Sequence, residues 1–535
     1  MRIFIFFLFL YSWGTNGLAQ SNPFQVYLEP VTISGLNGLQ AYAFGQAQGK
    51  WLLVGGRLDG LHRRTPGTAF DTVNNNHELM VVDPVNLQVW KAPISSLAVS
   101  IQEQLSSTNM EFHQDSNYLY ILGGYGFHGA TASKMTFASL CAIDVPSVIT
   151  AIVNGNPFQN FIRQINDPLF KVTGGHLKKI YHDYYLIGGN SFDGNYNPMG
   201  GPSYTQVYTN SIRRFKLNDN GTTITVTHLP EIVDAAAFHR RDYNAVPGIL
   251  PNGEEGVTVF SGVFQTGVDL PFLNCVQVDS SGYNINNTFQ QYYNHYHCAV
   301  LPIYSAAAQE MHTIFFGGIA QYFDSAGVLV QDNNVPFVKT IARVTQPASG
   351  VMTEYKLPVE MPGYLGAGSE FIPEESIARY ANDVIQQDNL IQDTTLAGYI
   401  FGGIQSTAKN IFQTNTGSQS AANHQLFKVY LIKNSPAGLD IINPQSTGSL
   451  QMQVYPNPGS GEFIINYSLR QECNVHLRIM NEQSQVVDDI NFSKQSKGPH
   501  QYHRASVDVQ ATTTYWILLE TPFERAVQKI IIHPR

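Results

Sequence analysis

The stretch WLLVGG at 51–56 is an apolar run that ends in a glycine pair, and the chain repeats this pattern five more times. The other versions are YLYILGG at 118–124, YYLIGG at 184–189, VTVFSG at 257–262, HTIFFGG at 312–318 and AGYIFGG at 398–403. Successive versions lie roughly 55 to 85 residues apart, a spacing typical of repeat architectures. Each period has room for about four short strands, so the repeat predicts an all-β fold, a six-bladed β-propeller.

The glycine pairs are expected to be structural. Glycine reaches positive φ without penalty and lets neighbouring backbones approach closely, which suits a strand that turns sharply beside the next blade. The predicted structural glycines are Gly55, Gly56, Gly123, Gly124, Gly188, Gly189, Gly262, Gly317, Gly318, Gly402 and Gly403. Only Ser261 departs from the pattern.

The first period continues with ELMVVDPVNLQVWKAP at 78–93, a strand, an Asp-Pro turn and a second strand that carries Trp90. Together with the glycine pairs, these residues resemble the kelch repeat, in which a Trp precedes a Leu-Pro-like exit. The resemblance covers residues 22–434, although the Trp is clear only at Trp90; two later units keep the exit as Leu229-Pro230 and Leu357-Pro358. The resemblance implies a kelch-type propeller over residues 20–434.

Composition narrows the class of protein. The chain has 535 residues, only 13% of them charged, and a net charge of −9, which favours a large, mildly acidic, soluble protein. No block of Lys and Arg appears, so nucleic-acid binding is disfavoured. Residues 1–19 combine Arg2 with a short apolar run and Ala19, which predicts a secretory signal peptide. No later segment is long and apolar enough to predict a transmembrane span.

Four cysteines allow disulfides in an oxidising compartment without demanding them. Cys275 and Cys298 are the most plausible pair because they are closest in sequence. Their spacing matches no zinc motif.

The last part of the chain predicts a second domain. Residues 435–449 lack periodicity and are expected to form a linker, and residues 450–535 contain strand-like runs typical of a small antiparallel sandwich. Its opening segment resembles the C-terminal sorting domain of the type IX secretion system, through Tyr455, Pro456, Asn457, Pro458, Gly461 and Phe463. The resemblance implies a Bacteroidetes-type protein that the type IX machinery exports, either secreted or attached to the outer cell surface.

The blade count predicts how the ring closes. The last unit is expected to have its inner strand near residues 379–382 and to lack one strand. A strand at about 24–33, near the N-terminus, is therefore predicted to complete the last blade, because an open sheet edge is a liability.

Alignment of the segments before the glycine pairs gives a candidate ligand site at one mouth of the channel. Histidine recurs there, and arginine grips carboxylates while histidine transfers protons near neutral pH. The candidate residues are Tyr42, His113, His176, His239, Arg240, Arg241, His297, Arg379 and Tyr380. Some of these histidines are equally well explained as packing residues.

Two classes of function stay open on the sequence. A propeller that binds a carbohydrate or protein without catalysis is favoured, so the protein is expected more probably not to be an enzyme. The alternative is sugar chemistry of the sialic acid mutarotase type, which needs an acid/base pair and a cationic grip on a carboxylate; a copper oxidase of the galactose oxidase type is a weaker alternative, because its ligand set cannot be assigned. No metal site, no cofactor and no catalytic residue is predicted, and no serine-hydrolase, zinc-protease or phosphate-loop motif occurs.

Overall fold

The structure is a computed structural model that describes residues 23–433, except 66, 199, 201, 326 and 327, and residues 451–534, except 458, 470, 482–485, 505–511, 523 and 524. The chain divides into two compact units, 1–434 and 435–535. The predicted signal peptide (1–19) and the predicted linker (435–449) lie outside the described residues. In the part that the structure describes, no helix has the length and apolar character needed to cross a membrane.

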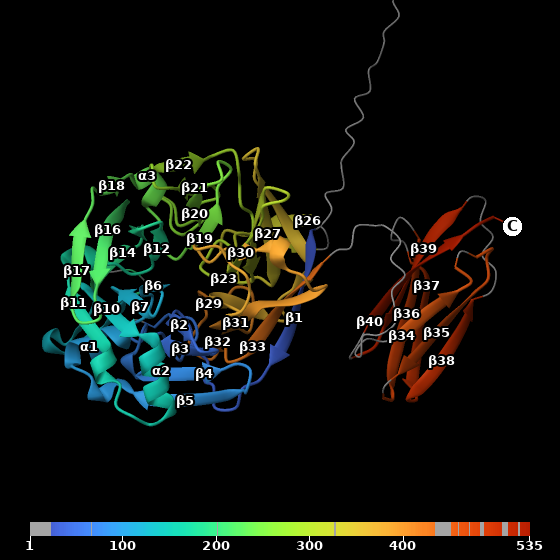
Figure 1. Ribbon diagram of the computed structural model, residues 1–535, viewed down its shortest axis with the longest axis horizontal. Helices are drawn as coiled ribbons and strands as arrows, with labels where there is room; N and C mark the ends of the chain where they lie inside the picture. Colours follow the sequence, from blue (N-terminus) through green and yellow to red (C-terminus); the bar gives the residue numbers. More distant parts are fainter. Residues whose placement is uncertain are drawn as a thin grey trace, which may run out of the picture. The chain divides into compact units, whose positions relative to one another are not determined.

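The first unit contains six antiparallel sheets that follow one another along the chain, and each begins with an inner strand (Figure 1). The first sheet has the order β2 (Ala43–Ala47), β3 (Lys50–Val54), β4 (Glu78–Asp83) and β5 (Gln88–Pro93). The second has β6 (Glu111–Asp115), β7 (Tyr118–Leu122), β10 (Ser139–Asp144) and β11 (Ile162–Asn166). The third has β12 (His176–Ile180), β13 (Asp183–Ile187), β16 (Ser211–Asp219) and β17 (Ile224–His228), with β18 (Ile232–Val233) beside β16.

The remaining three sheets repeat this plan, with longer strands in the fifth and sixth sheets. The fourth has β19 (Asn244–Ile249), β20 (Glu255–Phe260), β21 (Cys275–Val278) and β22 (Tyr283–Asn286). The fifth has β23 (Ala299–Ser305), β24 (Glu310–Phe316), β27 (Thr340–Pro347) and β28 (Thr353–Glu360), with β30 (Ile385–Gln386) parallel to β23. The sixth has β29 (Tyr364–Pro373), β31 (Thr394–Ser406), β33 (Leu426–Lys433) and β1 (Phe24–Val31), with β32 (Ser420–Ala422) beside β31.

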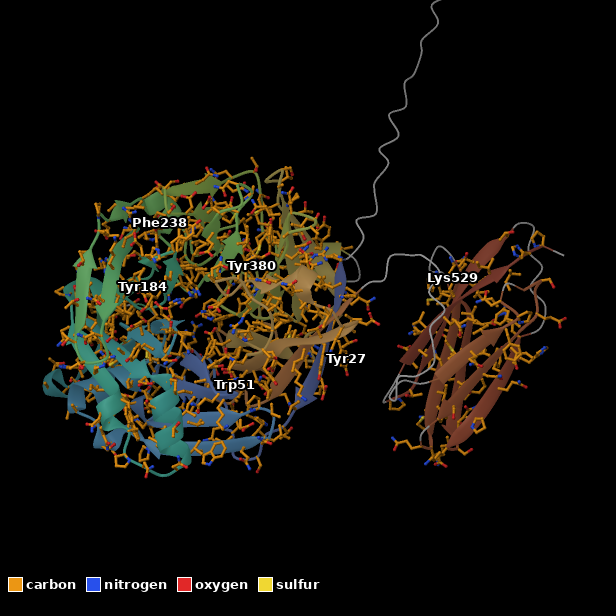
Figure 2. All side chains as sticks on the ribbon, viewed as in Figure 1. Tyr27, Trp51, Tyr184, Phe238, Tyr380 and Lys529 are labelled. Carbon is orange, nitrogen blue, oxygen red and sulfur yellow. The ribbon has the colours of Figure 1, made fainter. Side chains whose placement is uncertain are left out.

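The sixth sheet joins the two ends of the first unit. Strand β1 pairs antiparallel with β33, from Phe24 opposite Lys433 to Val31 opposite Leu426. Figure 2 shows Tyr27 of β1 at the outer edge of the ring, where its side chain is 51% exposed, and the buried Trp51 further inside. The prediction that the inner strand of this sheet lies near 379–382 is wrong. The inner strand is β29, and residues 374–393 connect it to β31.

Apolar clusters between the sheets close the ring. Each of six clusters draws its buried side chains from two neighbouring sheets. One of them joins the last sheet to the first, since Tyr399 and Phe401 lie in the same cluster as Trp51 and Leu53. Burial of apolar surface between sheets is therefore the main stabilising contribution around the ring.

The glycine pairs directly follow the second strand in five sheets and lie within β31 in the sixth, and all have a left-handed backbone conformation. All twelve positions have positive φ, including Ser261 at 51°, which explains how serine substitutes for the first glycine of its pair. The N–H of each second glycine donates to a carbonyl of the following sheet, and Gly403 donates to Leu39 at 2.9 Å, which returns to the first sheet. A Cβ on Gly123 would lie 1.9 Å from the Val172 carbonyl oxygen, so the close approach requires glycine there.

The insertions after the glycine pairs form structure of their own. Strands β8 (Tyr125–His128), β9 (Ser133–Thr136), β14 (Asn190–Gly194) and β15 (Tyr204–Tyr208) join into one four-stranded sheet, and β25 (Tyr322–Ser325) pairs with β26 (Val328–Gln331). The helices are α1 (Val99–Leu105), α2 (Val145–Val153) and α3 (Ala235–Phe238). The alternating patterns of these short strands were not recognised in the sequence, where 190–210 and 320–336 are expected to be loops.

The second unit consists of two antiparallel sheets. One has β34 (Gln451–Tyr455), β35 (Phe463–Leu469) and β38 (Gly498–Arg504); the other has β37 (Val486–Gln495), β36 (Cys473–Asn481), β39 (Thr513–Glu520) and β40 (Arg525–Ile532). Alternate side chains of β35 and β36 are buried, and residues of both sheets meet in one apolar cluster. The period of two in the sequence is the direct cause of this arrangement.

The cysteines are not paired. Cys141, Cys275, Cys298 and Cys473 are all free thiols, so the suggested Cys275–Cys298 disulfide is absent. These two residues belong to different sheets, although both contribute to the same apolar cluster. Burial raises the pKa of both thiols to about 12, so neither is a reactive thiolate near neutral pH.

Candidate functional site

A closed ring of six backbone hydrogen bonds surrounds the channel axis where the inner strands begin. Each bond joins neighbouring sheets, with N···O distances between 2.8 and 3.2 Å. From donor N–H to acceptor C=O, the bonds run from Ala41 to Gly368, Gly368 to His297, His297 to Asp242, Asp242 to Gly174, Gly174 to Asn109 and Asn109 to Ala41. We call this feature the backbone ring.

The backbone ring imposes an unusual conformation on its members. Ala41, Asn109, Gly174, Asp242 and Gly368 all have φ between 50° and 70°. Positive φ is uncommon outside glycine, although asparagine and aspartate tolerate it better than most residues. The conformation tilts the side chains of Asn109 and Asp242 toward each other, and Asn109 Nδ2 donates to Asp242 Oδ1 at 2.9 Å. Gly174 lies between these two residues in the ring.

The channel widens into a cavity on each side of the backbone ring. The loop cavity is lined by segments that follow the glycine pairs and has a volume of about 250 Å³. The turn cavity is lined by turns between the first and second strands of the sheets and has a volume of about 1110 Å³. A small cavity of about 50 Å³ shares Asn109 and Asp242 with the loop cavity and His176 and Glu370 with the turn cavity.

Aromatic side chains form much of the wall of the loop cavity. They are Phe70, Tyr125, Phe192, Tyr196, Phe264, Tyr296 and Phe412. Phe70 contacts both Tyr125 and Tyr196 in edge-to-face geometry, with ring centroids 5.6 and 5.7 Å apart. Edge-to-face contacts fix aromatic rings in place, so this wall offers flat apolar faces to a ligand.

Two arginines and a histidine supply the polar groups of the loop cavity. Arg241 binds Asp242 through Nη1 at 2.8 Å and Tyr208 through Nε at 3.2 Å. The guanidinium of Arg64 makes no hydrogen bond or ion pair within the described residues. His62 Nδ1 is buried and has no hydrogen-bond partner there either. An unpartnered buried polar atom is costly, so this nitrogen is available to hydrogen-bond a ligand in the cavity.

The charge of His62 follows from its surroundings. Burial, together with the nearby positive charge of Arg241, lowers the pKa of His62 to about 4. Its imidazole is therefore neutral at pH 7 and can either accept or donate a proton at Nδ1. A negatively charged ligand beside Arg241 would oppose this shift and make the imidazole a stronger base.

Two neighbouring loops hold these groups in position. Arg57 directly follows the first glycine pair and is bound to the Asp59 carboxylate at 2.7 and 2.6 Å and to Asn75 at 2.9 Å. Asn415 Nδ2 donates to the carbonyls of Leu61 and His62, at 2.7 and 3.1 Å. The loop that carries His62 and Arg64 is thus fixed both at its base and at its tip.

The turn cavity contains most of the predicted histidines. His113, His176 and His297 line it with Arg379, as expected, and Lys178 and Glu370 line it too. The rings of His176 and His297 stack with centroids 5.1 Å apart, and His176 Nε2 donates to the Tyr243 carbonyl at 2.7 Å. His297 Nε2 lies 2.9 Å from Glu370 Oε1.

Burial and charge separate the pKa values of these histidines. Burial lowers the pKa of His113 to about 4 and lowers that of His176 as well. Burial also acts on His297, but the Glu370 carboxylate outweighs it and raises the pKa of His297. The turn cavity therefore places neutral imidazoles beside one imidazole that favours its protonated form.

The predicted site residues do not form one site. Arg241 lines the loop cavity, whereas His113 and Arg379 line the turn cavity on the other side of the backbone ring. Four others have structural contacts. Two of them donate hydrogen bonds to carbonyls, Tyr42 to Phe401 at 3.1 Å and Arg240 to Ser261 at 2.7 Å. The other two pack on tyrosine rings, His239 on Tyr208 with centroids 3.8 Å apart and Tyr380 on Tyr304 with centroids 5.9 Å apart. Of these, only Tyr42 lines a cavity along the axis. The structure divides the predicted set because the alignment followed histidine rather than backbone geometry.

A spacing in the sequence could have located the backbone ring. Ala41, Asn109 and Gly174 each stand 15 residues before the second glycine of their unit, at Gly56, Gly124 and Gly189. Residues with a preference for positive φ at this fixed offset are the signal. No comparable signal precedes His62, Arg64 or Lys178, which lie in an insertion or on a strand. Among the described residues, no group of three or more His, Cys, Asp and Glu side chains could hold a metal ion.

The sorting motif connects the first and last strands of the second unit. Asn457 Nδ2 donates to the Lys529 carbonyl at 2.7 Å, and its Oδ1 accepts from the Ile531 N–H at 3.0 Å. Phe463 is buried in the apolar cluster. Pro458 lies outside the described residues.

Comparison with known proteins identifies the second unit. Residues 453–533 match the family described as "Secretion system C-terminal sorting domain". This domain marks cargo of the type IX secretion system, so the protein is a secreted or cell-surface protein. No curated protein matches the chain.

Solved structures resemble the chain in fold. "Structure of YjhT" shares 11% identity at a TM-score of 0.39 and covers 75% of this chain and 100% of its own. A beta-xylosidase named RS223 shares 10% identity at 0.31, over 77% and 97%. A glycoside hydrolase family 43 arabinoxylan arabinofuranohydrolase from Bacillus subtilis shares 10% identity at 0.25, over 93% and 96%.

These neighbours correct one expectation. Two of them are described as enzymes, a xylosidase and an arabinofuranohydrolase, and these descriptions stand against the expectation that this protein is not an enzyme. At identities of 10–11% and TM-scores of 0.25–0.39, the likeness carries no further argument about this chain. It assigns neither a reaction nor a substrate to this chain.

Proposed function

We propose that residues 23–433 form a six-bladed propeller of the kelch type, closed by its N-terminal strand, and that the loop cavity is the active site of an enzyme. The substrate class is a saccharide that carries a carboxylate, and the reaction is acid–base interconversion of sugar anomers. The observation that carries the proposal is that His62 Nδ1 and the Arg64 guanidinium line one cavity and have no hydrogen-bond partner among the described residues.

The repeated contacts between sheets support the propeller. Six sheets, six apolar clusters between neighbours and six glycine N–H groups that reach the following sheet all describe one unit repeated around an axis. The pairing of β1 with β33 supplies the outer strand that the last sheet otherwise lacks. The glycine-ended second strands are the feature shared with kelch repeats.

Three kinds of side chain support the substrate class. Guanidinium groups bind carboxylates through paired hydrogen bonds, and Arg64 and Arg241 both line the loop cavity. Sugars present C–H faces that stack on aromatic rings such as those of Phe70 and Tyr196. Asp242 lies at the floor of the same cavity and can accept hydrogen bonds from sugar hydroxyls.

His62 is the proton carrier of the proposed reaction. Its Nδ1 takes the proton of the anomeric hydroxyl while the bond between the anomeric carbon and the ring oxygen breaks. The same nitrogen returns the proton to that ring oxygen, which leaves an open-chain carbonyl form. Rotation of this form and the reverse steps give the other anomer, so atoms and charge balance without a cofactor. The substrate carboxylate beside Arg241 makes His62 basic enough for the transfer.

The experiment compares binding and turnover in matched variants. Purified protein is screened by thermal shift against uronic and nonulosonic acids and against neutral sugars of the same size. A ligand present at about 100 times its dissociation constant stabilises the fold by roughly 2.7 kcal/mol. Anomer exchange of any hit is then measured by NMR magnetisation transfer.

His62→Gln is expected to retain binding and lose exchange, and Arg64→Met to lose binding. His239→Gln is the matched control, because His239 stacks on Tyr208 and lines none of the three cavities along the axis. Unchanged exchange in His62→Gln, or equal stabilisation by acidic and neutral sugars, would contradict the proposal.

A further inference from the structure

The turn cavity contains a lysine whose surroundings differ from those of every other cation on its wall. Lys179 pairs with Asp115, and Arg379 binds Asp383 at 3.0 Å. The amine of Lys178 makes no hydrogen bond or ion pair within the described residues, although it lines the same cavity. A partly buried amine without a partner is unusual, since burial of a charged group is costly unless it is paired.

Strand geometry places this amine beside an acid–base pair. Lys178 follows His176 by two positions on β12, so both side chains leave the same face of the strand. His176 stacks on His297, which in turn lies 2.9 Å from the Glu370 carboxylate. These groups also interact electrostatically, because the Glu370 carboxylate acts on Lys178 and both Glu370 and Lys178 act on His297.

Burial in the cavity wall lowers the pKa of Lys178, and the carboxylates of Glu370 and Asp383 oppose this only in part. The neutral form of a lysine amine is a nucleophile, whereas the ammonium is not. The large cavity gives a small molecule access to this nitrogen.

We propose that Lys178 captures small hydroxylated aldehydes as a Schiff base in the turn cavity. The site is separate from the loop cavity and does not depend on the sugar chemistry proposed there. The lysine nitrogen forms a bond to the carbonyl carbon, and the carbonyl oxygen takes up a proton to give a carbinolamine. That oxygen then leaves as water while the carbon–nitrogen double bond forms.

His297 moves the protons that this sequence requires. Its imidazolium, which Glu370 favours, gives a proton to the departing hydroxyl and recovers the proton that the nitrogen loses. One amine and one aldehyde thus give one imine and one water, and no oxidant or reductant takes part.

The polar wall of the turn cavity selects a hydroxylated ligand. Asn382 Nδ2 donates to the Gly248 carbonyl at 3.1 Å, but its buried Oδ1 has no hydrogen-bond partner among the described residues. A hydroxyl group on the ligand would satisfy this acceptor. Gln46, Gln114 and Asn244 line the same cavity with further amide groups.

The test traps the imine on the protein in its secreted form. Protein at neutral pH is treated with glycolaldehyde and cyanoborohydride, and the modified lysines are quantified by peptide mass spectrometry. A lowered pKa leaves more of the amine uncharged, so Lys178 is expected to be modified several-fold faster than Lys216. Lys216 is a suitable internal reference because its side chain is 61% exposed.

Two comparisons separate capture in the cavity from general lysine reactivity. Lys178→Arg is expected to remove the fast adduct and leave the slow modification of Lys216 unchanged. Glu370→Gln is expected to slow capture and shift its pH profile, which a merely structural role would not do. Ethylene glycol, which lacks the carbonyl, should leave no adduct. Modification of Lys178 at the rate of Lys216 in the unaltered protein would overturn the proposal without recourse to any variant.

Discussion

Asn109 donates a hydrogen bond of 2.9 Å to Asp242, which belongs to the sheet after next, and the bond passes over Gly174. It links the inner strands of the second and fourth sheets across the third. The floor of the loop cavity is therefore held by side chains as well as by the backbone ring. Since Asp242 also binds Arg241, any shift of this floor moves the proposed carboxylate site.

Gly174→Ala is expected to destabilise the first unit by about 1–3 kcal/mol, because φ at this position is strained for any other residue. Its Cβ would also lie 3.1 Å from Asp242 Oδ1. Ala41→Gly is the matched control in the same ring and should change stability by less than about 1 kcal/mol, since glycine relieves its positive φ. Urea unfolding of both variants checks this, and equal effects would refute the role assigned to the ring.

Because of Glu111, we expect the free energy of unfolding to fall as pH rises. Burial raises the pKa of this carboxyl to about 8, whereas the unfolded chain has a value near 4.5. The folded state therefore binds the extra proton, and its contribution is complete below the unfolded pKa and is lost as pH rises through about 8, at roughly 1.4 kcal/mol per pH unit.

The check for Glu111 is the pH slope of the unfolding free energy in Glu111→Gln, which should be less negative than that of the unaltered protein. Glu354, whose pKa burial also raises to about 8, provides a second, independent case. The double variant should lose both contributions. Parallel curves for all four proteins would show that these carboxyls are not buried as described.

Arg57→Lys is expected to weaken ligand binding in the loop cavity by tenfold or more, about 1.4 kcal/mol, because one ammonium cannot replace paired guanidinium bonds. Arg57 holds Asp59 at two points and Asn75 at a third, and these bonds fix the loop of His62. Arg213→Lys, at a more exposed pair with Glu231, should leave affinity unchanged. Calorimetric titration of both variants with the acidic sugar found by thermal shift measures the two affinities.

Removal of residues 435–535 is expected to abolish export while the first unit still folds, because the two units have separate apolar clusters. Phe463→Ala should reduce export in a graded way, since loss of a buried Phe costs about 3–5 kcal/mol. Immunoblots of cell and culture fractions measure both effects. Normal secretion of the truncated chain would contradict the role of the sorting domain.

The repeat could be recognised in the sequence because the positive φ at the glycine pairs favours glycine at these positions. Five of the six directly follow the second strand of their sheet, the sixth lies within β31, and the period between them leaves room for the other strands. The inner strand of the last sheet was missed because Gly366 and Gly368 interrupt its apolar pattern. Residues 379–382, chosen in its place, belong to the connection that follows.

The candidate site could be predicted only in part. Histidine and arginine were expected near the axis, and Arg241, His176 and His297 are there. Which cavity a residue lines depends on its place relative to the ring residue of its segment: Arg241 precedes Asp242 and lines the loop cavity, whereas Asn244 follows it and lines the turn cavity. His62 could not be anticipated, because its place depends on the distant contact with Asn415.

The antiparallel pairing of β1 with β33 puts the two ends of the first unit side by side, with Phe24 opposite Lys433. A force that draws these ends apart would load the hydrogen bonds of this pair one after another, because they run perpendicular to the strands. We therefore expect the ring to open first between β1 and β33, by loss of one hydrogen bond after another. A chain anchored by its sorting domain and pulled through its N-terminus would yield first along this outer strand.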